Sequence, residues 1–157
     1  GLPLMSWSIL AFDHAPSVAH IVIACSDEKR AAVQEGVVGK LVLHKPVHFA
    51  TSGATRQESV YNALQVVPAG YDFVSVHDAV RPLIEVETIE QVIGTVRKSP
   101  KIAGAILAHR ATDTLKRVDG ATIVDTPDRS TFWAAQTPQV FKTRTLVEAH
   151  EVARQEG

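Results

Sequence analysis

The segment Gly53-Ala54-Thr55-Arg56-Gln57-Glu58-Ser59 combines groups that can hold an anion or a polar ring. Thr55 and Glu58 have the spacing of a capping box, so we expect a helix to begin here. Free N–H groups at a helix N-terminus attract anions, and Arg56 adds a positive charge at the same place. Ser59 lies three residues after Arg56 and would project from the same face. The segment therefore predicts a turn that binds a phosphate or a polar ring, with an ordinary strand-to-helix junction as the alternative.

A second polar group lies in the segment from Val76 to Pro82. Asp78 follows an apolar run, where a carboxylate can coordinate a hard cation or accept a hydrogen bond from a hydroxyl group. Arg81 can bind a phosphate through two parallel hydrogen bonds, or it can form a structural ion pair with Asp78. His77 should point to the opposite face of the strand, so we interpret it as structural.

The other polar residues give weaker indications. The seven histidines show no metal-ligand spacing, because Pro46 disfavours a helix between His44 and His48, and we therefore expect no metal bound by protein side chains. The run Gln136-Thr137-Pro138-Gln139 is interpreted as a buried polar turn. The single cysteine, Cys25, ends an apolar run, which indicates an inert buried thiol and fits a reducing cytosol.

Short apolar runs alternate with helical patterns along the chain. This alternation favours crossover units and a mainly parallel α/β sheet, whose ligands bind beyond the carboxyl ends of the strands. The predicted strands are 21–25, 47–51, 73–77 and 102–107, and the predicted helices are 6–12, 27–34, 55–67, 86–97 and 144–154.

The region from Thr112 to Thr126 breaks this alternation. Asp119-Gly120 predicts a two-residue hairpin turn, which would place Val118 opposite Ala121. An isolated hairpin is marginally stable in water, so it should lean on its own domain or on a second subunit. A solvated surface hairpin is the alternative.

The composition is that of a soluble globular protein. The 157 residues fit one domain, with 45% hydrophobic and 21% charged residues. The net charge of -1 gives no reason to expect nucleic acid or an acidic membrane surface as a partner, and no apolar stretch approaches the roughly 20 residues of a membrane span. Gly1 is not preceded by Met, and the start reads like the middle of a domain, so we expect a longer native chain.

Taken in order, a series of segments resembles the 2-C-methyl-D-erythritol 4-phosphate cytidylyltransferases of the non-mevalonate isoprenoid pathway. The resemblance implies a Rossmann-like α/β nucleotidyltransferase fold, with a protruding β-hairpin arm over residues 112–127 that interlocks two subunits. The matching segments are 52–60, 76–82, 113–117, 128–130 and 133–139.

The resemblance also implies roles for individual residues. The nucleotide-binding positions would be Gly53, Arg56 and Ser59. The substrate-binding positions would be Asp78, Ala79, Arg81, Thr114 and Thr137, and Arg129 would act in catalysis by holding the substrate phosphate. Thr114 and Arg129 are expected to reach into the site of the partner subunit.

The implied reaction is transfer of CMP from CTP to 2-C-methyl-D-erythritol 4-phosphate by a cytoplasmic homodimer, with Mg²⁺ bound mainly through the CTP phosphates. The family also has a glycine-rich phosphate loop before the matched region and a lysine-containing segment after it, which we expect outside residues 1–157. Two alternatives stay open: a cytidylyltransferase for another polyol phosphate such as ribitol 5-phosphate, and a non-catalytic nucleotide-binding or dimerisation module if the native chain is this short.

Overall fold

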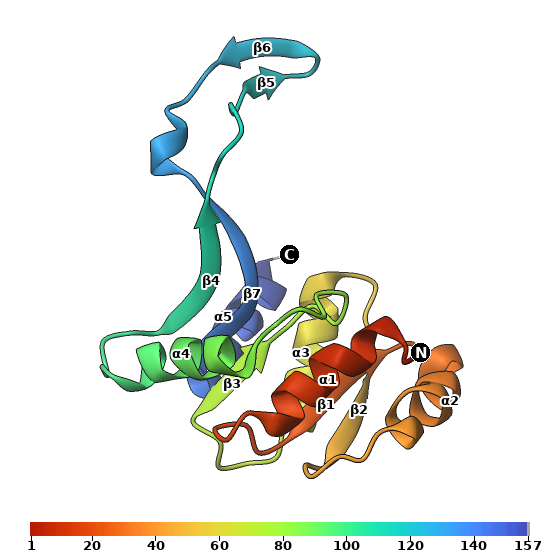
Figure 1. Cartoon of the computed structure of the whole chain (residues 1–157). Coiled ribbons are helices and arrows are strands. Elements are labelled where there is room, and N and C mark those ends of the chain that lie inside the picture. The colour runs from red at the N-terminus through yellow and green to blue at the C-terminus, as the bar shows by residue number, and fades with distance from the viewer. Residues whose placement is uncertain (157) are drawn as a thin grey trace.

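The computed structural model describes residues 1–156 as an α/β body from which a long, narrow arm projects (Figure 1). The helices are α1 (Leu4–His14), α2 (Asp27–Gly36), η1 (Val38–Lys40), α3 (Arg56–Val66), α4 (Val86–Arg97), η2 (Arg129–Thr131) and α5 (Thr143–Glu156). The strands are β1 (Ile21–Cys25), β2 (Val47–Thr51), β3 (Phe73–Val76), β4 (Gly104–Arg110), β5 (Arg117–Asp119), β6 (Thr122–Asp125) and β7 (Trp133–Lys142). The predicted α/β fold is confirmed, and no helix within residues 1–156 is both long and apolar enough to span a membrane.

β1 and β2 form a separate two-stranded parallel sheet. β1 and β2 pair in register from Ile21 opposite Val47 to Cys25 opposite Thr51, and α2 and η1 form the crossover between them. A parallel pair needs such a crossover, because its strands cannot be joined by a tight turn.

β3, β7 and β4 form a second, three-stranded sheet whose pairings are both antiparallel. β7 lies between β3 and β4 and runs against both, so β3 and β4 share a direction. β7 is not among the strands predicted from the sequence, and the turn predicted at Gln136–Gln139 is wrong, because these residues lie inside this strand. Gln139 pairs with Ile106 of β4, and the next paired residue of β7 is Ala135, which lies opposite Ala108. Residues 136–138 therefore have no partner in β4. Pro138 has no N–H, so such an irregularity is where a strand tolerates it.

Helices cover both faces of the layer that these two sheets form (Figure 1). α1 and α4 contact each other on one face, and α3 and α5 contact each other on the other face. The main core forms where one side of α4 meets β7 at Val140, which is fully buried. The buried positions of α4 have helical spacing, as the sequence predicts; they are Ile89, Val92, Ile93 and Val96.

The arm continues from β4 and β7 and ends in the β5–β6 hairpin (Figure 1). The predicted turn is shifted by one residue, because Asp119 lies opposite Thr122 and the loop is Gly120-Ala121. Gly120 has a φ of +55°. Within residues 1–156, every residue with a positive φ is a glycine. A turn centred on Asp119-Gly120 would require that conformation of Asp119 as well. The chain therefore places the left-handed conformation on glycine alone.

Candidate functional site

The turn before α3 is built as its sequence predicts. The Thr55 hydroxyl accepts the Glu58 N–H at 3.1 Å, and the Glu58 carboxylate accepts the Ala54 and Thr55 N–H groups at 2.7 and 3.3 Å. The Ser59 hydroxyl accepts the Gly53 N–H at 3.0 Å and donates to the Thr55 carbonyl at 2.9 Å. A Cβ atom on Gly53 would lie 2.2 Å from the Glu58 Cβ. Glycine is therefore required for the close approach of this turn to the helix.

Asp78 joins this turn to the end of β3. Its Oδ2 accepts a hydrogen bond from Arg81 Nε at 3.0 Å, and its Oδ1 lies 3.5 Å from Arg56 Nη2. Burial alone would raise the pKa of Asp78. The hydrogen bond from Arg81 and the charge of Arg56 outweigh this effect, so the pKa lies below 3.8. The Asp78–Arg81 ion pair considered from the sequence is present. Both guanidinium groups can still bind a ligand, because the Arg56 and Arg81 side chains are 60% and 44% exposed.

A directional chain of hydrogen bonds fixes the Asp78 segment. The Thr137 hydroxyl, which belongs to a residue only 4% exposed, accepts the Asp78 N–H at 3.2 Å and lies 3.0 Å from His77 Nδ1. His77 Nε2 lies 3.2 Å from the Arg81 carbonyl oxygen. That oxygen can only accept, so Nε2 carries the proton and Nδ1 accepts from Thr137; this tautomer is assigned from the hydrogen-bond partners. Burial lowers the pKa of His77 below 6.5, which keeps the ring neutral, as its hydrogen bonds to Thr137 and Arg81 require. His77 is structural as predicted, but it acts inside the site.

Two further residues that sequence reasoning missed support the same segment. The Ser8 hydroxyl on α1 lies 3.1 Å from the Ala79 carbonyl oxygen and 3.2 Å from that of Arg81. The Gln136 side chain accepts a hydrogen bond from Arg81 Nη1. Ser8 is buried on an otherwise mostly apolar helix, which is the signal that could have identified it.

A cavity of about 620 Å³ lies between β1 and β3, and Arg56, Ser59 and Asp78 of the site are among the residues that line it. Consecutive residues of both strands line the cavity. Because successive side chains point to opposite faces of a strand, the cavity must lie along the edges of β1 and β3 and not above one face. His20 and Tyr71, which precede β1 and β3, have ring centroids 5.1 Å apart at one end. Asp78 follows the opposite end of β3 and contacts Arg56. β1 and β3 therefore run in the same direction, and the site lies at the carboxyl ends of the strands.

The arm holds the remaining predicted positions. Thr114 and Arg129 are exposed, and Arg129 Nη1 donates to the Thr112 carbonyl at 2.6 Å. η2, which contains Arg129, lies along the arm away from the body (Figure 1). Within the described chain the structure thus does not bring Thr114 and Arg129 to the other predicted residues. It does bring together Gly53, Arg56, Ser59, Asp78, Ala79, Arg81 and Thr137.

Two places offer ligands for a cation. In the site, Asp78 supplies one carboxylate, whose two oxygens face Arg56 and Arg81. Away from the site, Asp13, His14 and His44 form a group that sequence reasoning missed.

The chain matches known proteins over its whole length. The family model for 2-C-methyl-D-erythritol 4-phosphate cytidylyltransferase matches residues 1–157. Proteins with that name from Caldanaerobacter subterraneus and Acaryochloris marina are 37% and 40% identical, over all of this chain and 68% and 65% of theirs. The chain thus spans about two thirds of the length of these relatives.

Solved structures agree with the sequence matches. The cytidylyltransferase of the same name from Thermus thermophilus superposes with a TM-score of 0.78 at 29% identity, over all of this chain and 69% of the other. The 4-diphosphocytidyl-2C-methyl-D-erythritol synthase from Anaerococcus prevotii has a TM-score of 0.87 at 20% identity, over 99% and 66% of the two chains, and supports the fold alone. From the matched family model and these relatives, the chain belongs to the 2-C-methyl-D-erythritol 4-phosphate cytidylyltransferase family.

Proposed function

We propose that the protein transfers CMP from CTP to 2-C-methyl-D-erythritol 4-phosphate, giving 4-diphosphocytidyl-2-C-methyl-D-erythritol and pyrophosphate. The observation that carries the proposal is the joining of the Gly53–Ser59 turn to Asp78 and Arg81 at the carboxyl ends of the strands. The identity of the substrates rests on the names of the relatives.

The turn would bind the cytosine and the arginines would bind phosphate groups. Ala54 has no polar side chain, so base recognition falls on the backbone at Gly53 and on Ser59, whose hydroxyl already lies at the backbone N–H of Gly53. Arg56 stands at the start of α3, where its charge and the helix N-terminus both attract anions.

The chemical step needs positioning and charge stabilisation. An oxygen of the substrate phosphate attacks the α-phosphorus of CTP, and the bond to the β-phosphate oxygen breaks, so that pyrophosphate leaves with the electron pair. A phosphate monoester is already ionised at neutral pH, so no general base is required. Mg²⁺ bound mainly through the CTP phosphates would neutralise part of their charge. The chain of hydrogen bonds through Thr137 and His77 holds Asp78 and Arg81 in place for this step.

We further propose that the cavity between β1 and β3 holds another parallel strand, which leads a phosphate-binding loop to Arg56 and Asp78. The proposal is supported by the two strand edges that face the cavity and by their common direction. Hydrogen exchange tests it. The edge amides of β1 and β3 that face the cavity should exchange as slowly as the paired amides of β7 in the full-length protein. Fast exchange of these edge amides in folded protein would contradict it.

The arm is proposed to form a homodimer and to carry Thr114 and Arg129 into the partner's site. In support, Val118, Ile123 and Val124 on the hairpin are 56%, 59% and 53% exposed, which leaves apolar side chains for a partner to cover. Deleting residues 112–127 should convert a dimer into a monomer in sedimentation. A dimer that survives the deletion would contradict the proposal.

Mixed dimers test whether Arg129 acts in the partner's site. Arg129→Ala should lower turnover by roughly two or more factors of ten, at about 1.4 kcal/mol each, with CTP binding unchanged. Mixing this variant with Arg56→Ala should restore some activity, because one site of each mixed dimer then contains both wild-type arginines. If mixed dimers form without regaining activity, the arm serves its own subunit.

Substrate preference decides between the leading proposal and its closest alternative. We expect turnover with 2-C-methyl-D-erythritol 4-phosphate to exceed that with ribitol 5-phosphate when both are assayed side by side with CTP. The reverse order would assign the site to another polyol phosphate. A cytoplasmic location is part of the proposal and is supported by the single free cysteine.

A further inference from the structure

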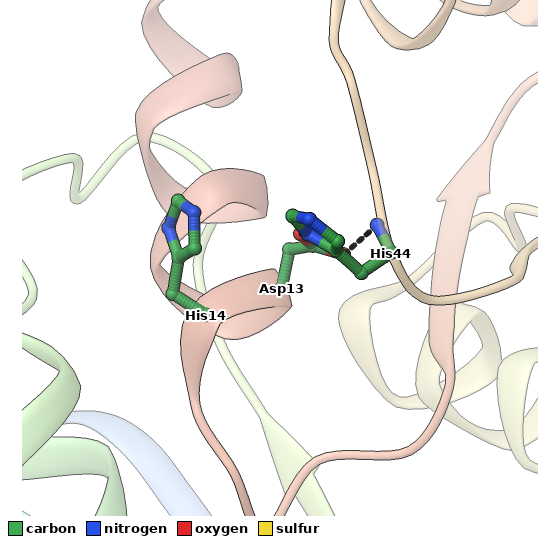
Figure 2. A group of neighbouring side chains, drawn as sticks. All are labelled: Asp13, His14 and His44. Carbon is green, nitrogen blue, oxygen red and sulfur yellow. Dashed lines mark hydrogen bonds and ion pairs between the residues drawn. The ribbon is translucent and has the colours of Figure 1, made fainter.

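A second group of polar side chains lies outside the site, at the end of α1 (Figure 2). Asp13 and His14 are the last two residues of this helix, and His44 lies in the segment between η1 and β2. Their potential ligand atoms all lie within 4.8 Å of one another. None of the three lines the cavity between β1 and β3.

Asp13 is a rigid, fully buried carboxylate. Its side chain is 0% exposed, and its Oδ1 accepts the backbone N–H groups of His44 and Lys45, each at 2.9 Å. These bonds fix the orientation of the carboxylate and leave Oδ2 directed at His44 Nδ1, also at 2.9 Å. Figure 2 shows His44 reaching Asp13 from the neighbouring segment, while His14 stands apart from this pair on the helix.

Both histidines can adjust. His14 is exposed, and the His44 side chain is 71% exposed, so each ring can rotate with little loss of packing. Their ring centroids are 6.1 Å apart. Zinc bonds of about 2.0–2.2 Å in a tetrahedral site place the ligand atoms about 3.3 Å apart. Rotation of the exposed histidine rings would bring their nitrogen atoms from within 4.8 Å to this shorter separation, while the backbone N–H groups hold Asp13 in place.

The charges around the group allow a cation. Lys45 follows His44 in the chain, and its Nζ donates to the carbonyl oxygens of Phe12 and Ala15. The C-terminal end of a helix also favours positive charge.

We propose that Asp13, His14 and His44 bind Zn²⁺ and clamp the end of α1 to the segment before β2. One carboxylate and two imidazoles suit zinc, whereas Mg²⁺ and Ca²⁺ require mostly oxygen ligands. Water would complete the coordination. The clamp would act on the helix that supports the Asp78–Arg81 segment through Ser8.

The test is a titration of tag-free, chelator-treated full-length protein with Zn²⁺ alone, followed by calorimetry. The absorption spectrum of bound Co²⁺ reports the ligands independently. His14→Asn and His44→Asn remove one ligand each and, because both rings are exposed, should leave the fold intact by circular dichroism. His109→Asn is the matched control, since His109 is also exposed and lies on β4.

We expect wild type and His109→Asn to bind one equivalent of Zn²⁺ with the same affinity. Each ligand variant should bind at least tenfold more weakly and lose the tetrahedral Co²⁺ spectrum. Zn²⁺ should raise the thermal midpoint of wild type but not of the ligand variants. The inference is wrong if wild type binds no Zn²⁺, or if binding survives both His14→Asn and His44→Asn unchanged.

Discussion

Replacing Thr137 with valine tests whether its hydroxyl holds the Asp78 segment. The change keeps the shape of the side chain but removes the group that accepts the Asp78 N–H and donates to His77 Nδ1. Thr137 is only 4% exposed, so water cannot readily replace the lost partner. Leaving a buried polar group unpaired costs about 1–3 kcal/mol. For a chain of this size, each kcal/mol lowers the thermal midpoint by about 2–4 °C.

Thr143→Val is the matched control. The Thr143 hydroxyl is also buried, yet it has no hydrogen-bond partner within residues 1–156. Its removal should therefore leave stability unchanged or raise it. Urea unfolding followed by circular dichroism compares the two variants through their midpoints at equal slope. If Thr137→Val unfolds at the same urea concentration as Thr143→Val, the hydrogen-bond chain does not stabilise the site.

Three further changes probe the rest of the site. Arg56→Ala should raise the CTP dissociation constant at least several-fold by calorimetry, since a charge-assisted hydrogen bond contributes about 1.5–3 kcal/mol; an equal effect of Arg144→Ala, on α5, would show that the loss is not specific. Gly53→Ala should weaken CTP binding and lower the thermal midpoint, because the added Cβ must displace Glu58, and unchanged values would mean that the turn tolerates the shift. The free energy of unfolding should fall as the pH drops below 6.5, because the pKa of half-buried His77 is lowered and the unfolded chain binds more protons there. His77→Gln should flatten this slope, measured by urea unfolding at several pH values, whereas an unchanged slope would assign the effect to another group such as His150.

The features that short-range patterns determine could be predicted from the sequence. The Thr55–Glu58 capping box and the buried side of α4 depend on residues three or four apart, and both are present as expected. The turn at Gly53 and the end of β3 were also expected to meet, because the carboxyl ends of parallel strands share one edge.

Features that depend on distant contacts could not be predicted. β7 has a polar centre with Pro138, which resembles a turn until its position between β3 and β4 is known. The Asp13–His44 contact joins segments that are 31 residues apart, so no local spacing indicates it. In the hairpin, both possible turns contain Gly120, and only the backbone conformation of the neighbouring residue decides the register.

The central claim is tested most directly by measuring pyrophosphate release from CTP and 2-C-methyl-D-erythritol 4-phosphate by the full-length protein. We predict release that requires both substrates and Mg²⁺, yields the cytidylylated polyol in equal amount, and falls by about two factors of ten or more in Arg129→Ala. No pyrophosphate release by folded wild-type protein with both substrates present would contradict the account.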